Sequence, residues 1–313
     1  MGKKKNCNAV AHKCRLRKGK YRKAKIVTHQ NGAMDLVLPD IPEEELQQIL
    51  PNVSIVTITK DRGAFAGILL YNWMNIKYPR EKLEWVILDD SEHRTDYDLE
   101  DYLPPDDPYI KYVKLDRWCP VAEKRNKAVE LASHEFIVHM DDDDYYFPDH
   151  VLAKIRILLQ YNCQGVHSLP IGVYDMMERS SYIFDPTGKA DIDTNDVAEA
   201  TLAYRKDYWR NHKFVSDNPE GMGEGRGFIG KRFSKWVNLH FMFNMISITH
   251  SKNVTGHGRR FINENLDTVQ TGRFEDVFPP AFNLNLDNIR KILAAEYVQP
   301  DIPAHYEKEL RSF

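Results

Sequence analysis

The sequence has few cysteines and no long apolar run. Its four cysteines, Cys7, Cys14, Cys119 and Cys163, are scattered along 313 residues, which excludes a disulfide-stapled fold and favours a reducing, cytosolic setting. No segment approaches the roughly 18–20 apolar residues that a membrane-spanning helix requires. The N-terminus also lacks the apolar core of a secretory signal, so we expect a cytoplasmic protein without a transmembrane segment.

Acidic residues are missing from the first 25 positions, which hold 11 lysines and arginines. The remaining chain has 32 basic against 46 acidic residues, so a basic tail precedes an acidic body. Such a like-charge block is typical of a solvated arm, with weak contact to an anionic surface or nucleic acid as the alternative. Cys7, His12 and Cys14 offer too few ligands, too irregularly spaced, for a zinc site.

Internal repeats are also absent, and strand-like and helix-like segments alternate instead. The first half of the chain predicts strands at 53–59, 83–88, 109–115 and 135–140 and helices at 41–50, 66–76, 121–132 and 148–161. This alternation is typical of an α/β fold with a mostly parallel sheet. The second half predicts a mixed region with strands at 165–174, 199–205 and 245–251, followed by a helix at 287–297.

Polar clusters follow three of the predicted strands: residues 57–62, Asp89-Asp90, and the four consecutive aspartates at 141–144. Ligands of open α/β sheets bind beyond the carboxyl ends of the strands, where these clusters should converge. Carboxylate oxygens suit Mg²⁺ or Mn²⁺, which take one or two carboxylates and complete their shell with water and phosphate oxygens. The sequence therefore predicts a divalent-cation and phosphate site at this edge.

Three segments together resemble family 2 glycosyltransferases of the GT-A fold. They read "VSIVTITKDR", "WVILDDSE" and "EKRNKAVELASHEFIVHMDDDDYYFPDHV" and cover about residues 52–152. The resemblance implies a Rossmann-like α/β fold with a central, mixed but mostly parallel sheet flanked by helices, and a smaller acceptor-side mixed region. We accordingly expect a tail and short helix (1–50), a GT-A domain (51–285, with halves 51–152 and 153–285) and a C-terminal helical extension (286–313).

The resemblance also assigns the donor site. Thr57 and Thr59 would flank the nucleotide. Asp90 would accept a hydrogen bond from the imide N–H of uracil, which indicates a UDP-linked sugar. Lys124 and Arg125 would lie toward the diphosphate or the ribose. The full set of expected nucleotide-sugar contacts is Thr57, Thr59, Arg62, Asp90, Lys124, Arg125, Asn126, Asp141 and Asp142, with Asn126 bracing a loop.

Counting back from Pro148, Asp141 and Asp143 take the outer positions of the family's Asp-x-Asp motif. The resemblance makes Asp143 the main ligand of Mn²⁺ or Mg²⁺, with Asp141 on the sugar hydroxyls or on the metal through water. His250 can complete a Mn²⁺ shell, although a structural histidine is an equal alternative. His257 is a weaker candidate of the same kind.

The family inverts the anomeric configuration, which requires a carboxylate base from the second half of the chain. Glu224 is our first candidate because it stands between two glycines, where backbone can approach a substrate closely, although it can also be an ordinary loop carboxylate. Asp217 and Glu220 are the alternatives. Trp118, Trp209 and Trp236 can serve as sugar platforms, but aromatic residues more often belong to the core.

These residues predict a metal-dependent inverting glycosyltransferase that moves a sugar from a UDP-sugar to a hydroxyl of a glycan, lipid or protein. A sugar nucleotidyltransferase is the alternative enzyme, but "TKDRGAF" after the first strand contains a single glycine where a glycine-rich phosphate loop would be needed. A non-catalytic carbohydrate- or nucleic-acid-binding protein that uses the basic tail is the third possibility.

Overall fold

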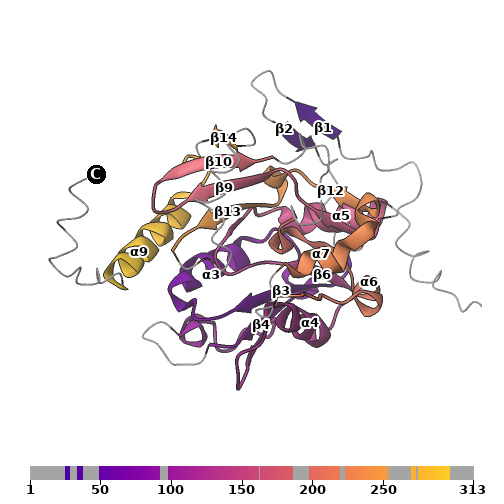
Figure 1. The fold of residues 1–313 in the computed structure, drawn as a ribbon, viewed down its shortest axis with the longest axis horizontal. Helices are drawn as coiled ribbons and strands as arrows, with labels where there is room; N and C mark the ends of the chain where they lie inside the picture. The colour runs from indigo at the N-terminus through magenta and orange to yellow at the C-terminus, as the bar shows by residue number, and fades with distance from the viewer. Residues whose placement is uncertain are drawn as a thin grey trace, which may run out of the picture.

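The computed structural model describes residues 25–28, 34–37, 49–91, 98–161, 163–185, 197–218, 223–251, 253, 269–272 and 274–296 (Figure 1). The basic residues 1–24, most of the predicted helix 41–50, Glu220 and His257 lie outside these ranges. Two short strands, β1 (Lys25–Thr28) and β2 (Met34–Val37), pair antiparallel in the region that the sequence assigned to a tail.

A seven-stranded sheet has the order β12-β8-β11-β6-β3-β4-β5. The strands are β3 (Val53–Thr59), β4 (Leu83–Asp89), β5 (Ile110–Lys114), β6 (Phe136–His139), β8 (Gly165–His167), β11 (Ala203–Arg205) and β12 (Trp236–Asn238). All neighbouring pairs are parallel except those that β11 makes with β6 and β8. The predicted mixed, mostly parallel sheet is confirmed.

Helices cover both faces of this sheet because its central strands are apolar on both sides. Ile55 and Trp85 pack with α3 and α5, whereas Val56 and Val86 pack with α4, α6 and α7. The helices are α3 (Ala66–Asn75), α4 (Val121–Leu131), α5 (His150–Gln160), α6 (Lys206–Asn211) and α7 (Glu224–Ile229). No helix within the described ranges has the length and apolar character needed to cross a membrane.

A second sheet has the order β14-β10-β9-β13-β7. Its strands are β7 (Tyr145–Tyr146), β9 (Ile171–Asp175), β10 (Ser180–Phe184), β13 (Met245–Thr249) and β14 (Val269–Gly272). The segment 165–174, predicted as one strand, is divided between the two sheets as β8 and β9. Pro170 lies in the break, where its missing N–H cannot contribute to a strand ladder.

Short 3-10 turns connect these elements. They are η1 (Gly63–Phe65), η2 (Arg80–Lys82), η3 (Leu99–Tyr102), η6 (Glu199–Thr201), η7 (Gly230–Lys235) and η8 (Phe241–Phe243). The first half of the segment 199–205, predicted as a strand, is the turn η6, and only its second half is β11.

The last described helix, α9 (Pro280–Glu296), begins seven residues before the predicted helix 287–297. Pro280 suits the first helical position, where its missing N–H costs no hydrogen bond. Phe282, Leu286 and Ile289 are buried at helical spacing and share a core with residues of the second sheet. The expected boundary at 285/286 therefore falls inside a packed helix, and the proposed domain division stays a prediction.

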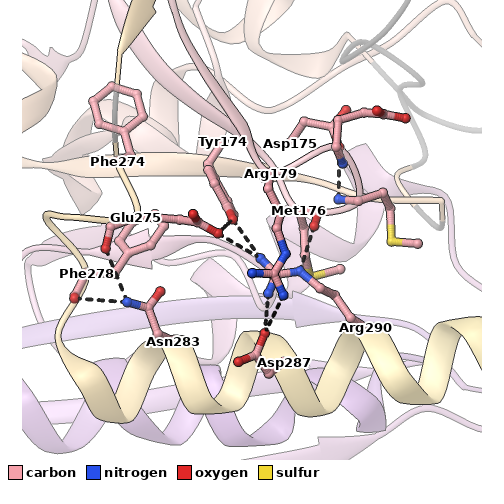
Figure 2. Close-up of polar contacts among 12 residues, drawn as sticks. Tyr174, Asp175, Met176, Arg179, Phe274, Glu275, Phe278, Asn283, Asp287 and Arg290 are labelled. Carbon is pink, nitrogen blue, oxygen red and sulfur yellow. Dashed lines mark hydrogen bonds and ion pairs between the residues drawn. The ribbon is translucent and has the colours of Figure 1, made fainter.

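Hydrogen bonds of the Arg290 side chain link α9 to the end of β9, as Figure 2 shows. Its Nε donates to the Met176 carbonyl at 2.7 Å, and its Nη2 donates to the Tyr174 hydroxyl at 2.6 Å. Tyr174 in turn hydrogen-bonds Glu275, while Asp287, one turn before Arg290 in α9, pairs with Arg290 and Arg179. These contacts satisfy the charged groups of the cluster, so we interpret it as structural.

Candidate functional site

The strands β3, β4 and β6 end at one edge of the seven-stranded sheet. Thr59 lies opposite Asp89 in the register, and Val56 lies opposite His139. Residues 141–144, here called the acidic stretch, follow β6 at this edge and lead into β7 of the second sheet. The structure thus brings together the three polar clusters of the sequence, as the topology of a wound sheet predicts.

Thr57 is one predicted nucleotide contact that lies inside the protein. Its hydroxyl donates to the Met140 carbonyl at 2.6 Å and accepts the indole N–H of Trp85 at 2.9 Å. The side chain therefore joins β3, β4 and the end of β6 instead of facing a ligand. Thr59, two residues closer to the edge, remains the threonine nearer to the acidic stretch, and its hydroxyl hydrogen-bonds Asp142.

Asp90 and Lys124 form a buried ion pair at the end of β4. Asp90 is 1% exposed and also accepts the backbone N–H of Cys119 at 2.8 Å. Lys124 additionally donates to the Thr59 carbonyl at 3.1 Å. A buried carboxylate requires such a counter-charge, so Lys124 serves Asp90 instead of the diphosphate expected for it, and Asp90 presents no exposed oxygen to a uracil.

The Asp143 carboxylate is surrounded by the side chains of Arg62, His250 and Asn253. Its Oδ2 contacts the guanidinium of Arg62, lies 3.0 Å from Nε2 of His250, and accepts from Nδ2 of Asn253 at 3.4 Å. Arg62 and His250 also contact one another at 3.0 Å. Although burial acts in the opposite direction, Arg62 and His250 hold the pKa of Asp143 below its ordinary value. Of the three residues predicted to bind metal, Asp143 and His250 therefore lie together and both contact Arg62, whereas Asp141 has another partner.

The other two central aspartates differ from Asp143. Burial and the neighbouring charges of Asp143 and Asp141 raise the pKa of Asp142 to about 7, against the opposing effects of Arg62 and Thr59. Its Oδ2 is buried and has no hydrogen-bond partner in the part of the chain that is described. Asp144 is structural, because its Oδ1 accepts the backbone N–H of Ile248 at 2.8 Å and so joins the acidic stretch to β13.

Asp141 faces Arg125 on α4 and not the Asp143–His250 pair. The guanidinium forms two parallel hydrogen bonds to the Asp141 carboxylate, at 3.1 and 3.2 Å, and its Nε donates to Glu224 at 2.6 Å. Although burial opposes it, these carboxylates raise the pKa of Arg125. Arg125 and Glu224 are buried and Asp141 is partly exposed, so the guanidinium links the acidic stretch to α7, where a diphosphate contact had been expected.

Glu199 on η6 is a carboxylate that the sequence analysis did not single out. Its Oε1 accepts the backbone N–H of Gly225 at 2.7 Å, directly after Glu224. Burial and the charge of Glu224 raise the pKa of Glu199 to about 7, while Arg125 acts in the opposite direction. Its segment, "DVAEATLAYR", contains no motif that points to chemistry, so its place beside Glu224 is visible only in the folded chain.

A comparison with protein families matches the model described as glycosyl transferase family 2 to residues 54–183. The match starts in β3, includes the whole acidic stretch and ends in β10. The matched residues, 54–183, are here called the family 2 domain. The resemblance based on residues 52–152 is thereby confirmed, and the seven-stranded sheet with helices on both faces is its GT-A architecture.

Two solved structures illustrate what the family 2 domain is similar to. S. aureus TarS 1-349 in complex with UDP-GlcNAc is 14% identical, with a TM-score of 0.48, over 64% of this chain and 60% of that chain. The mannosyltransferase PcManGT from Pyrobaculum calidifontis, in complex with GDP-Man and Mn2+, is 15% identical, with a TM-score of 0.49, over 84% and 80%. The chain thus spans less than two thirds of the TarS fragment. Comparison with curated proteins gave no match.

Several other residues that the sequence analysis singled out lie within the described ranges. Asn126 hydrogen-bonds both backbone groups of Phe214 and the indole N–H of Trp209, and so joins α4 to the segment that follows α6. Trp209 and Trp236 are buried in the core, whereas Trp118 is 40% exposed. Asp217 is exposed, and no described residue forms a hydrogen bond or ion pair with it.

Asp142 and Asp143 of the family 2 domain, with His250 beyond it, are the candidate ligands for a divalent cation. Two carboxylates and an imidazole fit Mn²⁺ or Mg²⁺, and the unpartnered Oδ2 of Asp142 is an oxygen that a cation would satisfy. Among the described residues, no three His, Cys, Asp or Glu side chains are already gathered around one point as a metal site, and this includes Asp142, Asp143 and His250. The donor set therefore fits an ion that completes its shell with water and substrate phosphate, and not a cage made of protein alone.

Lys154 on α5 lies beneath the acidic stretch, with Nζ 5.7 Å from the centre of the Tyr146 ring. The side chain is fully buried, and Nζ has no hydrogen-bond partner among the described residues. Burial lowers the pKa of Lys154 to about 7, although Asp141 opposes this effect. At pH 7 we expect Lys154→Met to raise the free energy of unfolding by about 2–4 kcal/mol, because methionine removes the cost of burying an amine.

The gain from Lys154→Met should depend on pH. The pKa is depressed in the folded state, so wild-type stability is lost as pH falls from the unfolded pKa of lysine towards 7. The difference between variant and wild type in urea denaturation should therefore shrink as pH rises towards 10. Lys77→Met, at an exposed lysine, should show no such trend, and an equal trend in both variants would contradict the assignment.

Proposed function

We propose that the protein is a metal-dependent, inverting glycosyltransferase that moves a sugar from a nucleotide-sugar to an acceptor hydroxyl. The observation that supports this most strongly is the acidic stretch of the family 2 domain. It contains a buried, unpartnered oxygen of Asp142, and the neighbouring residue Asp143 contacts Arg62 and His250 at the carboxyl edge of the sheet. This edge is where open α/β sheets bind ligands.

The donor's diphosphate is proposed to bind at Arg62 and the acidic stretch. Asp143 and Asp142, with His250, would hold Mn²⁺ or Mg²⁺, which neutralises the diphosphate and makes it a better leaving group. Arg62, whose guanidinium already rests on Asp143, would add a fixed positive charge for the same phosphate oxygens. Thr59 would flank the nucleotide from the end of β3.

A UDP-linked donor is our first choice, and it rests on the Asp-Asp-Ser sequence at the end of β4. The Asp90 carboxylate is not exposed, so we propose that it shapes the base pocket through Lys124 and the Cys119 backbone. The acceptor would be a glycan, lipid or protein hydroxyl. Cys119 and Cys163 are free thiols, which supports a proposed cytoplasmic location.

The reaction proceeds by attack of the acceptor oxygen on the anomeric carbon, from the face opposite the diphosphate. The new carbon–oxygen bond forms as the bond to the diphosphate breaks, with its electron pair on the leaving phosphate oxygen. A protein carboxylate takes the hydroxyl proton. Arg125 would keep Glu224 and Asp141 in place on the acceptor side of this centre.

Thermal unfolding with and without Mn²⁺ tests the proposal. UDP-GlcNAc, GDP-mannose, UDP and GDP are each added to the full chain. A ligand at about 100 times its Kd stabilises the native state by about 2.7 kcal/mol, so a nucleotide-sugar should raise Tm by several degrees, and more with Mn²⁺. Nuclear magnetic resonance of the cleaved sugar should show inverted anomeric configuration. Absence of any shift with all four ligands would contradict the proposal, and pyrophosphate release from a nucleoside triphosphate and a sugar phosphate would favour a nucleotidyltransferase.

A further inference from the structure

Glu199 is held near the acidic stretch by strand pairing and by the side chain of Tyr146. It begins η6, directly before β11, which pairs with β6. The next residue, Ala200, accepts a hydrogen bond from the Tyr146 hydroxyl at 3.2 Å, and the same hydroxyl accepts the backbone N–H of Asp141 at 2.7 Å. Glu199 is therefore tied to the acidic stretch although 58 residues separate it from Asp141 in sequence.

Gly225 makes room for the Glu199 carboxylate. Its N–H donates to Oε1 at 2.7 Å. A Cβ atom at position 225 would lie 2.9 Å from Cδ of Glu199 and closer still to Oε1, a separation that real Cβ atoms do not show. The carboxylate of Glu199 thus occupies the space that a side chain following Glu224 would need, and this explains the glycine at 225 better than backbone flexibility does.

The charged groups that face Glu199 are Glu224 on α7 and Arg125 on α4. Glu224 is 3% exposed and its carboxylate is paired with Arg125 at 2.6 Å, so it is poorly placed to accept a substrate proton. Glu199 remains partly exposed. Burial and Glu224 bring its pKa to about 7, which suits a base that works near neutral pH.

We propose that Glu199 is the general base that removes the proton from the acceptor hydroxyl, and that Glu224 is a positioning residue that holds Arg125. This assignment rests on the proposed function. The hydroxyl proton passes to the Glu199 carboxylate while the acceptor oxygen forms its bond to the anomeric carbon. The bond from that carbon to the diphosphate breaks, and the leaving oxygen keeps the electron pair. With water as acceptor, the same step is donor hydrolysis.

The test compares wild type with Glu199→Gln, Glu224→Gln and, as a matched surface control, Glu123→Gln. Release of nucleoside diphosphate from UDP-GlcNAc or GDP-mannose, whichever binds, is followed with water as acceptor from about pH 5.5 to 9. Wild type should rise about tenfold per pH unit below pH 7 and level off above it. Glu199→Gln should be about 10²–10⁴-fold slower, and its pH–rate profile should lose the bend near pH 7, where the wild-type rate levels off. Its donor affinity, measured by calorimetry, should change less than about twofold.

The controls separate a base from a structural role. Glu224→Gln should lower the rate but keep the bend near pH 7, and Glu123→Gln should match wild type. Azide gives up no proton when it attacks the anomeric carbon, so azide-dependent release should survive in Glu199→Gln. Gly225→Ala leaves the Glu199 carboxylate chemically intact but displaces it, and should lower the rate and move the bend; it serves as the second test if Glu199→Gln does not fold.

Three outcomes would overturn the assignment. The first is a Glu199→Gln variant with the wild-type rate and bend. The second is loss of azide-dependent release together with water-dependent release in that variant. The third is a wild-type chain that binds the donor but never cleaves it. This outcome would contradict the base assignment but not the proposed donor site. Failure of any nucleotide-sugar to bind would instead contradict the proposed function itself.

Discussion

Asp143→Asn is expected to lower nucleotide-sugar turnover by about 10³-fold. The carboxylate contacts Arg62 and His250, and both keep its pKa below the ordinary value, so it carries its charge throughout the neutral range. Asparagine has a similar shape but lacks the negative charge. We propose that this charge binds the divalent cation. Initial rates of nucleoside diphosphate release, measured across a Mn²⁺ titration at pH 7.5, give the effect.

Asp149→Asn is the matched control for Asp143→Asn. Its carboxylate is half-exposed near the start of α5 and pairs with Lys77 at 3.5 Å. The control should retain the wild-type rate within about twofold, because an exposed ion pair contributes little. An Asp143→Asn variant with the wild-type rate and the wild-type Mn²⁺ dependence would remove Asp143 from the proposed cation site.

Arg125→Met is expected to lower the free energy of unfolding by about 3–5 kcal/mol, because loss of one partner leaves buried charge uncompensated. The guanidinium is the shared partner of Asp141 and Glu224, and it also contacts Nδ1 of His139 at 3.2 Å. Methionine fills a similar volume but offers no donor. Urea denaturation at pH 7, followed by tryptophan fluorescence, measures the change.

Lys127→Met, two residues along α4, controls for loss of a positive charge. Lys127 is partly exposed and pairs with Glu123 at 2.8 Å, so its replacement should stay within about 0.5 kcal/mol. The double variant Arg125→Met with Glu224→Gln should lose less than the sum of the single losses, by at least about 1 kcal/mol. Strict additivity would show that Arg125 and Glu224 do not stabilise one another.

The parts of the fold that the sequence predicted are those with strong local signals. Residues 53–59 are nearly all apolar and β-branched, and β3 has these same bounds. The polar clusters at the ends of β3, β4 and β6 were predicted to meet because parallel strands share one carboxyl edge, and they do. By contrast, the start of α9 was missed, since "PAFNLNLD" mixes apolar and polar residues without a clear break.

The roles of individual site residues were harder to predict because they depend on partners that are distant in sequence. Lys124 was expected to contact a diphosphate, but its ammonium group forms a buried ion pair with the Asp90 carboxylate. Asp141 was expected near the metal, yet Arg125 offers it two parallel hydrogen bonds. Glu199 has no motif around it, and its place beside Glu224 depends on the pairing of β11 with β6 and on its hydrogen bond to Gly225. Competition among buried charges decided each case.

The acidic stretch joins β6 of one sheet to β7 of the other, and this has a consequence for how the protein is made. Arg62 lies 81 residues before Asp143, and His250 lies 107 residues after it. Loops of this length must close before these three side chains meet, which makes their contacts slow to form. A growing chain can form β3, β4 and β6 early, but Asp143 gains His250 only after β13 has been synthesised and docked. The protein should therefore acquire its capacity for ligand binding late in synthesis, when both sheets are present.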